Sequence, residues 1–394
     1  MIAGGGTGGH VLPALAVAQA LVERGHDRST IELVGSRRGQ EEALLGGAGF
    51  PVTLWPGRGL VRRAGARGLW ANARALAGLA RATVGALAAL RRWRPAVVVS
   101  VGGYASFPAG LAAVLLRIPL VLVNVDALPG LVHRVLGRFA AASAVAFPGT
   151  PLPRAVVTGS PVRGEITAVE RSPEGAARAR ASLGLPVDRR TLAAFGGSLG
   201  ARRINDAVCG LAGRWSDRDD VAVLQVTGRR EFERLAGPAR SGGAPAGLCH
   251  RLVPFVEQMD LLYASADLVV SRAGAMTVAE LAAAGVPSVL VPLPGAPGDH
   301  QTANARALVE AGAAVLVPDA ECDAARLDAV VGELLGDDAR LQAMSVAARA
   351  LGAPGAAERV AAIVEAQGSR GRSADEDPSG GRSSDRPPSG GRRG

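Results

Sequence analysis

Two glycine-rich segments have residue types suited to binding phosphate. Residues 4–10 read Gly-Gly-Gly-Thr-Gly-Gly-His, and residues 195–201 read Phe-Gly-Gly-Ser-Leu-Gly-Ala. Each lies between an apolar run and a helical pattern, so each is expected to join a strand to a helix. Glycine lets the first backbone amides of that helix approach an anion, and the helix dipole adds about half a positive charge there. The sequence therefore predicts a phosphate-bearing ligand in a cleft between two halves.

His10 ends the first of these turns and opens the helix that follows. A histidine in this place could simply cap or pack the helix. Beside a phosphate-binding loop that faces a cleft, a neutral imidazole is also well placed to accept a proton. We favour this second interpretation, in which His10 is a general base.

Two further segments combine strand ends, turns and helix starts. Residues 271–280 contain Thr277-x-x-Glu280, a capping-box pattern that would by itself explain Glu280. The alternative is that this helix start faces a phosphate or sugar while Glu280 accepts hydrogen bonds from ribose hydroxyls. Residues 292–305 form a Pro/Gly-rich loop in which Asp299 is expected to cap a helix, leaving His300 and Gln301 as uncommitted polar groups.

Other kinds of chemistry have weaker signals. The pattern Gly-x-Gly-x-x-Gly over residues 4–9 matches a dinucleotide fingerprint, and Arg37 after the second strand could meet a 2′-phosphate. An NADP-dependent oxidoreductase therefore stays as an alternative. The Asp-x-Asp pairs at 217–219 and 375–377 match a divalent-metal site only in number, so we expect no metal and no cofactor.

Alternating strand and helix patterns position these segments. In the first half we expect a helix over 12–23, a strand over 31–34, a helix over 69–92 and strands over 97–101 and 120–123. In the second half we expect strands over 191–195, 221–227, 268–271 and 288–292. Almost continuously apolar strands that alternate with helices indicate parallel sheets covered on both faces. The predicted fold class is α/β, with two Rossmann-like parallel-sheet domains facing across a cleft.

The domain limits follow from composition. We expect an N-terminal domain over 1–162 and a C-terminal domain over 163–366. Charged, Pro-punctuated residues 171–190 are expected to belong to the interdomain region. Residues 367–394 are rich in Ser, Gly, Arg and Pro, and this tail is expected to be disordered.

Charge and composition limit the kinds of partner that this protein is expected to bind. The 394 residues are 48% hydrophobic and 20% charged, and the net charge of +9 comes from arginine because the chain has no lysine. No nucleic-acid-binding motif accompanies this charge, so we expect no nucleic acid and favour an anionic membrane surface. On the helix expected over 69–92 and just before it, one stripe carries Arg67, Arg74, Arg81 and Arg92. This stripe is either a solvated face or, with nearby tryptophans, a surface that rests on lipid.

Five segments together resemble the GT-B glycosyltransferases of family 28, a class that includes the bacterial enzyme converting lipid I to lipid II in peptidoglycan synthesis. The matching segments are residues 5–16, 101–104, 159–163, 196–202 and 272–280. The resemblance extends over residues 1–366 in the order of the family. It is therefore far more specific than a single glycine motif.

The resemblance implies a reaction and a set of residues. The reaction is an inverting, metal-independent transfer of N-acetylglucosamine from UDP-N-acetylglucosamine to the C4 hydroxyl of the muramoyl sugar of undecaprenyl-pyrophosphoryl-N-acetylmuramoyl-pentapeptide. The enzyme would be peripheral, at the cytoplasmic face of the cell membrane, with His10 as the base. Residues 1–162 would form the acceptor and membrane-side domain. Residues 163–366 would form the UDP-sugar-binding domain, with its last helix packing back on the first domain. The implied donor-binding residues are Thr7, Gly8, Gly9, Arg163, Ser198, Val256, Ala275, Met276, Thr277, Val278, Ala279, Glu280 and Gln301.

One segment departs from the family pattern. Where the family carries His-Glu-Gln-Asn at the end of a first-domain strand, this chain has Val123-Asn124-Val125-Asp126, and Leu199 stands where glutamine is common. Asp126 is a candidate substrate-binding residue. The change keeps open a related UDP-sugar transferase with a different acceptor and a catalytically silent UDP-sugar-binding protein. A sugar-nucleotide epimerase shares the fold but would need another set of acids and bases.

Overall fold

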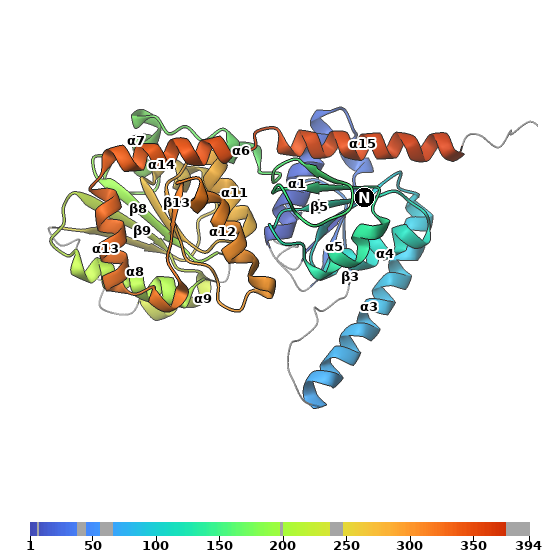
Figure 1. The fold of residues 1–394 in the computed structure, drawn as a ribbon, viewed down its shortest axis with the longest axis horizontal. Helices are drawn as coiled ribbons and strands as arrows, with labels where there is room; N and C mark the ends of the chain where they lie inside the picture. The colour runs from blue at the N-terminus through green and yellow to red at the C-terminus, as the bar shows by residue number, and fades with distance from the viewer. Residues whose placement is uncertain (6–7, 38–44, 56–65, 198–199, 237–246, 376–394) are drawn as a thin grey trace, which may run out of the picture.

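The computed structural model describes residues 1–5, 8–37, 45–55, 66–197, 200–236 and 247–375. Within these residues the chain forms two parallel sheets, each flanked by helices and set side by side along the molecule (Figure 1). Long helix α3 (Ala66–Trp93) projects from the first of them. The structure thus has the two α/β halves that the alternating pattern predicts.

The first sheet has seven parallel strands in the order β3-β2-β1-β4-β5-β6-β7. They are β1 (Ile2–Gly4), β2 (Leu33–Ser36), β3 (Val52–Trp55), β4 (Val98–Gly102), β5 (Leu120–Asn124), β6 (Ala142–Val145) and β7 (Ala155–Val157). Its helices besides α3 are α1 (Gly8–Glu23), α4 (Phe107–Leu115) and α5 (Leu131–Leu136), with the short 3-10 helices η1 (Arg28–Thr30), η2 (Tyr104–Ser106) and η3 (Gly137–Phe139).

The second sheet has six parallel strands in the order β10-β9-β8-β11-β12-β13. They are β8 (Arg190–Phe195), β9 (Val221–Val226), β10 (Cys249–Val253), β11 (Leu268–Ser271), β12 (Ser288–Leu290) and β13 (Ala314–Leu316). Its helices are α6 (Gly164–Thr167), α7 (Pro173–Ser182), α8 (Arg202–Arg214), α9 (Arg229–Leu235), α10 (Met259–Ser265), α11 (Ala275–Ala284), α12 (His300–Glu310), α13 (Ala324–Leu335) and α14 (Asp338–Leu351), with η5 (Pro297–Asp299) and η6 (Asp319–Glu321).

Strand order reverses at the first strand of each sheet. β1 lies between β2 and β4, where Gly4 pairs with Gly102, and β8 lies between β9 and β11, where Phe195 pairs with Ser271. In open parallel sheets, ligands bind outside the carboxyl ends of the strands where the order reverses. Both glycine-rich segments follow these strands, so the predicted phosphate sites lie where the strand order reverses.

The last helix, α15 (Ala356–Asp375), crosses from the second half to the first and lies along α1 (Figure 1). Val360, Ala361 and Val364 are buried in the same core as residues of α1, and the Arg359 guanidinium donates two hydrogen bonds to the Thr158 carbonyl. The helix continues to Asp375, so the prediction of a disordered tail is wrong for residues 367–375. A helix held by packing at its start extends cooperatively, one hydrogen bond per added residue.

Residues 171–190 also differ from expectation. They contain helix α7, which packs on α10, and Arg171 donates to the carbonyls of Tyr263 and Ala266 at the end of α10. An arginine at a helix C-terminus satisfies carbonyls that have no partner within the helix. This segment is therefore part of the second half, and we retain residue 163 as the proposed domain limit.

Candidate active site

His10 lies in the first turn of α1 and packs against the end of β4. A Cβ built on Gly102 would lie 2.9 Å from His10 Cδ2 and 3.3 Å from His133 Cε1. Gly102 has a φ of 104°, which only glycine adopts easily, so the close approach of the ring and the turn both need glycine here. The half-buried His10 ring therefore lies at the carboxyl edge of the first sheet, where the cleft is expected.

A buried polar cluster adjoins His10. The His133 ring nitrogens lie 3.0 Å from Asn124 Oδ1 and 3.2 Å from the Ser100 carbonyl oxygen. Burial first, and the charge of His10 second, lower the pKa of His133 to about 4, so this ring is neutral near pH 7. Sequence reasoning missed His133, because it follows Asn124 by nine residues and carries no motif.

Helix α11 begins in a different way from the capping box. Gly274 is its N-cap and has no side chain, which leaves the first-turn amides to an outside acceptor. Thr277 lies inside the helix, so the capping-box interpretation of Glu280 is wrong. Glu280 points instead into the domain, because Tyr263 and Arg163 offer it hydrogen-bond and charge partners there.

Glu280 is 5% exposed and accepts a hydrogen bond of 2.9 Å from the Tyr263 hydroxyl. Its other oxygen lies 3.8 Å from Arg163 Nη2, and Arg163 Nη1 is 2.9 Å from Glu165 Oε1. Burial outweighs the arginine and raises the pKa of Glu280, and burial together with Glu280 raises that of Tyr263 well above its usual value. The phenol thus stays a donor, and Glu280 Oε1 has no hydrogen-bond partner among the described residues.

The loop before α12 uses the polar groups that the sequence left uncommitted. Gln301 Oε1 accepts from the Leu293 amide at 2.9 Å, and His300 Nδ1 lies 2.9 Å from the Pro297 carbonyl oxygen. Asp299 occupies the N-cap position, but its carboxylate accepts from the Thr302 hydroxyl instead of capping a backbone amide. Because the Gln301 oxygen closes the loop, only its amide nitrogen could donate to a ligand.

Asp126 joins the two halves. Its Oδ1 accepts from Asn304 Nδ2 at 3.0 Å, while Asn304 Oδ1 accepts from the Ala127 amide at 2.8 Å. Asn304 is fully buried on α12 and also lies 3.3 Å from the carbonyl oxygen of Ala273, just before α11. The segment that departs from the family pattern is thus part of the contact between the domains.

The other predicted residues lie in several different places. Ala275 and Met276 are buried in one core with Val11, so α11 of the second half contacts α1 of the first. Gly8 and Gly9 begin α1, and Thr277, Val278 and Ala279 lie within α11. Val256 is partly buried against a hydrophobic core of the second half. Thr7, Ser198 and Leu199 lie outside the described residues. Arg163 lines a hollow of about 360 Å³ between α1, α6 and the start of α15.

Within the described ranges no group of three or more His, Cys, Asp and Glu side chains could hold a metal ion. Arg37, the residue that suggested a 2′-phosphate, donates from Nε to the Leu54 carbonyl at the end of β3. The described site therefore consists of helix starts, one arginine, one buried carboxylate and two histidines.

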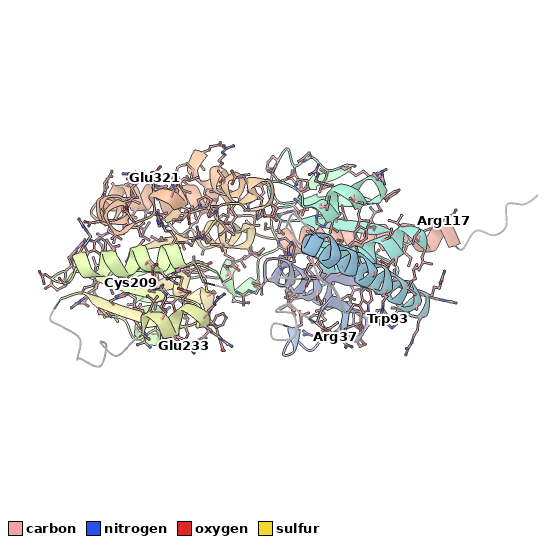
Figure 2. The ribbon with its side chains drawn as sticks, turned by 90° about the horizontal axis from the view of Figure 1, so that it is seen from below. Arg37, Trp93, Arg117, Cys209, Glu233 and Glu321 are labelled. Atoms are coloured by element: carbon pink, nitrogen blue, oxygen red, sulfur yellow. The ribbon has the colours of Figure 1, made fainter. Side chains whose placement is uncertain are left out.

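A surface of the first half combines exposed apolar and basic side chains, and we call it the apolar–basic surface. It comprises Leu115, Arg117, Leu131, Arg134, Val135, Arg138 and Phe139 on α4, α5, η3 and the loop after α4. Phe139 and Arg117 also line a groove of about 400 Å³. Figure 2 shows Arg117 and Trp93 at the end of this half that points away from the second. The spacing of the α5 residues is that of a core face, so sequence alone does not show that they are exposed.

The arginine stripe on α3 is described only in part. Arg81 and Arg92 are exposed, as both interpretations of the stripe predict, and Leu90 of the same helix is buried. The side chains of Arg67 and Arg74 lie outside the described part of the chain. None of the described helices is long and apolar enough to cross a membrane.

Fold and site together define a class of enzyme. Two parallel α/β domains meet with helix starts at their switch points, which is the architecture of a GT-B glycosyltransferase. The N-terminal domain model of glycosyltransferase family 28 matches residues 1–145, and its C-terminal domain model matches residues 191–360. The chain belongs to glycosyltransferase family 28.

Relatives cover nearly the whole chain. The UDP-N-acetylglucosamine--N-acetylmuramyl-(pentapeptide) pyrophosphoryl-undecaprenol N-acetylglucosamine transferase of Moorella thermoacetica is 41% identical over 373 residues, 92% of this chain and 97% of that protein. The enzyme of the same name from a Nocardioides species is 43% identical over 364 residues, covering 92% and 96% of the two chains. The crystal structure of MurG from Acinetobacter baumannii matches with a TM-score of 0.71 at 30% identity, over 93% of this chain and 98% of that one.

Substitution of Glu280 tests the balance between burial and charge pairing. Because the folded state raises the pKa of Glu280 above its ordinary 4.5, it binds this proton more tightly than the unfolded state, and stability falls as the pH rises above that value. Glu280→Gln keeps an oxygen that accepts from the Tyr263 hydroxyl, and it removes the free-energy cost of burying a charged carboxylate. We expect it to unfold at higher urea concentration than wild type near pH 7, with the difference vanishing at about pH 4.

The matched control is Glu165→Gln, because Glu165 also contacts Arg163 but is half exposed. It should show no such gain near pH 7. Lower stability of Glu280→Gln at neutral pH would mean that the attraction to Arg163 outweighs burial.

Proposed function

We propose that this enzyme transfers N-acetylglucosamine from UDP-N-acetylglucosamine to the C4 hydroxyl of the muramoyl sugar of undecaprenyl-pyrophosphoryl-N-acetylmuramoyl-pentapeptide, lipid I, and so forms lipid II for peptidoglycan synthesis. The observation that carries this proposal is 41% identity over 92% of the chain to a transferase named for that reaction. The position of His10 at the sheet edge, with α11 of the second half packed on the same helix, supports it.

The proposed step is a single displacement with inversion. The acceptor hydroxyl transfers its proton to His10 while the hydroxyl oxygen forms a bond to the anomeric carbon of the donor. The bond from that carbon to the diphosphate breaks, and UDP leaves with the electron pair. Helix-start amides and the Arg163 guanidinium stabilise the developing negative charge, which makes a divalent cation unnecessary.

The donor is proposed to lie chiefly against the second half. The first-turn amides of α11 and Arg163 would meet the diphosphate, and Glu280 Oε1 would accept from ribose hydroxyls. Both Arg163 Nε and Glu280 Oε1 are buried and without hydrogen bonds among the described residues. Buried polar atoms in this state gain most from a ligand that satisfies them. Gln301, Val256 and the residues at the two glycine turns keep the donor-binding roles that the family resemblance implies.

The test is transfer of labelled N-acetylglucosamine from its UDP donor to lipid I. We expect lipid II to form at the same rate with excess chelator as with magnesium, because amides and arginine take the place of the cation. Strict dependence on added divalent metal would contradict the mechanism. A silent UDP-sugar-binding protein would bind the donor without turnover, and calorimetric titration with UDP-N-acetylglucosamine and with NADPH separates such a protein from an oxidoreductase.

A second candidate is a related UDP-sugar transferase with a different acceptor. The observation that favours it is the segment Val123–Asp126, which lacks the ionisable His and Glu of the family pattern and contacts the second half through Asp126. Transfer to another hydroxylated lipid but not to lipid I, with donor binding intact, would select this candidate.

Replacement of the base gives a sharper result. Loss of a general base costs about two to four orders of magnitude in rate. We expect His10→Ala to lower kcat by this factor while the Kd for UDP-N-acetylglucosamine stays within about threefold of wild type. His250→Ala, a half-buried histidine on β10 of the second sheet, is the control and should keep full turnover. An equal loss of donor affinity in His10→Ala would make His10 a structural residue.

We further propose that the enzyme binds anionic lipid at the cytoplasmic face of the membrane through the apolar–basic surface and the exposed arginines of α3. A lipid-linked acceptor requires the site to approach a bilayer. Apolar side chains rimmed by arginine suit the boundary between headgroups and acyl chains.

Vesicle co-sedimentation tests this attachment. Binding is expected to need phosphatidylglycerol, to weaken as salt rises because exposed charges are screened, and to fall at least severalfold in Leu131→Ser/Phe139→Ser. Val346→Ser, which changes an exposed apolar residue on α14, is the matched control. Binding that ignores both salt and the double substitution would place the contact elsewhere.

A further inference from the structure

His133 and His10 converge on one point of the backbone. A Cβ on Gly102 would contact both rings, at 3.1 Å from His10 Nε2 and 3.3 Å from His133 Cε1. His133 comes from α5 and is 3% exposed, whereas His10 comes from α1 and is only half-buried. A buried imidazole thus lies beside the proposed base without itself reaching the open part of the site.

The two ring nitrogens of His133 face the ends of two neighbouring strands. Asn124 Nδ2 donates to the Asp126 carbonyl at 2.6 Å, so Asn124 Oδ1 is the end that lies 3.0 Å from His133 Nδ1. His133 Nε2 lies 3.2 Å from the Ser100 carbonyl oxygen and 3.4 Å from the Ser100 hydroxyl oxygen. A neutral ring carries one N–H and donates it to one of these strand ends. The ring therefore connects the ends of β4 and β5.

The same hydrogen bonds hold the turn that carries Gly102. The Ser100 hydroxyl is 3.0 Å from the Ser106 hydroxyl, which donates to the Gly103 carbonyl at 3.0 Å. The Tyr104 hydroxyl donates to Ser36 Oγ on β2 at 3.0 Å. With His133 at Ser100, the turn is fixed to β2, β4 and β5, and His10 packs on its outer side.

Charge adds a second requirement. When His10 accepts a proton from the acceptor hydroxyl it becomes a cation, and a charged imidazole next to it would oppose that step. Burial keeps His133 neutral at working pH, as its lowered pKa of about 4 indicates. The carboxylate of Asp126 is bonded to Asn304, and Arg134, the neighbouring cation on α5, is exposed. Among the described contacts, His133 therefore presents an uncharged ring to His10.

We propose that His133 is a positioning residue for His10: it holds the Gly102 turn through Asn124 and Ser100 and presents a neutral ring beside the base. The proposal rests on the proposed function of His10. It also gives Asn124 a role, because this residue of the departing segment Val123–Asp126 is the hydrogen-bond partner of His133. The cluster reaches the second domain, since Asp126 binds both Asn124 and Asn304.

The test compares His133→Leu with His133→Asn. Leucine fills the space but removes both hydrogen bonds, whereas the asparagine amide can still donate to Asn124 Oδ1. A misplacement of about 1 Å costs up to a hundredfold in rate, so we expect kcat to fall about ten- to hundredfold in His133→Leu with the donor KM unchanged. His133→Asn should recover most of this loss, and His250→Leu should lose none. Rates are taken per folded molecule, from unfolding curves at the assay temperature.

A spectroscopic readout keeps this inference separate from the reaction. The chain has five histidines, so the ring signals of His10 can be followed by NMR in histidine-labelled protein. The midpoint of the His10 titration should move in His133→Leu and return in His133→Asn. If wild type does not act on lipid I, the proposed function fails, but this titration still tests the positioning role.

Three outcomes would overturn the role of His133: an unchanged kcat and His10 titration in His133→Leu, equal impairment of both variants, or a loss confined to the donor KM. If His133→Leu does not fold, His133→Ala takes its place, with and without free imidazole. Added imidazole should then restore turnover and the His10 titration. Failure of imidazole to restore either would likewise reject the positioning role.

Discussion

The pairing of two strand ends in the first sheet is the constraint on which the candidate site depends. Gly4 at the end of β1 is opposite Gly102 at the end of β4, and α1 begins only a few residues after β1. His10 in the first turn of α1 is therefore carried directly over Gly102. A side chain at Gly102 would occupy the place of the ring. The register of β1 with β4 therefore determines where the His10 ring lies.

The second half meets this edge with helix starts instead of a catalytic side chain. Ala275 and Met276 at the start of α11 pack in the core that contains Val11 of α1, and Asn304 of α12 bonds Asp126 across the same contact. A nucleotide sugar held at the start of α11 would thus lie next to the helix that carries His10. Helix α15 adds to this contact, because Val360, Ala361 and Val364 lie in the same core and Arg359 donates to the Thr158 carbonyl. The two family 28 domain models match one half each, with His10 in the first and α11 in the second.

Predictions made from neighbouring residues held best. Strand β11 has the limits that its apolar run predicts, and both glycine turns lead from a strand toward a helix. Predictions failed where distant residues compete for a side chain. The pattern Thr277-x-x-Glu280 is a local capping signal, yet Tyr263 and Arg163 draw Glu280 inward, because a buried carboxylate needs partners more than the helix start needs a cap. Helix α15 likewise extends beyond its apolar segment, because packing on α1 stabilises its first turns and further residues then join the helix cooperatively.

The sequence by itself determined two α/β halves, their phosphate-binding turns, His10 as the candidate base and the resemblance to family 28. These features depend on backbone sterics and apolar periodicity within short stretches, which adjacent residues specify. Only the tertiary structure decided that His133 lies beside His10, that Asp126 bonds the second domain and that Leu131 and Val135 of α5 face outward. Each of these joins residues far apart in the chain or depends on what covers them, and burial and hydrogen bonding exist only once the strands and helices have packed.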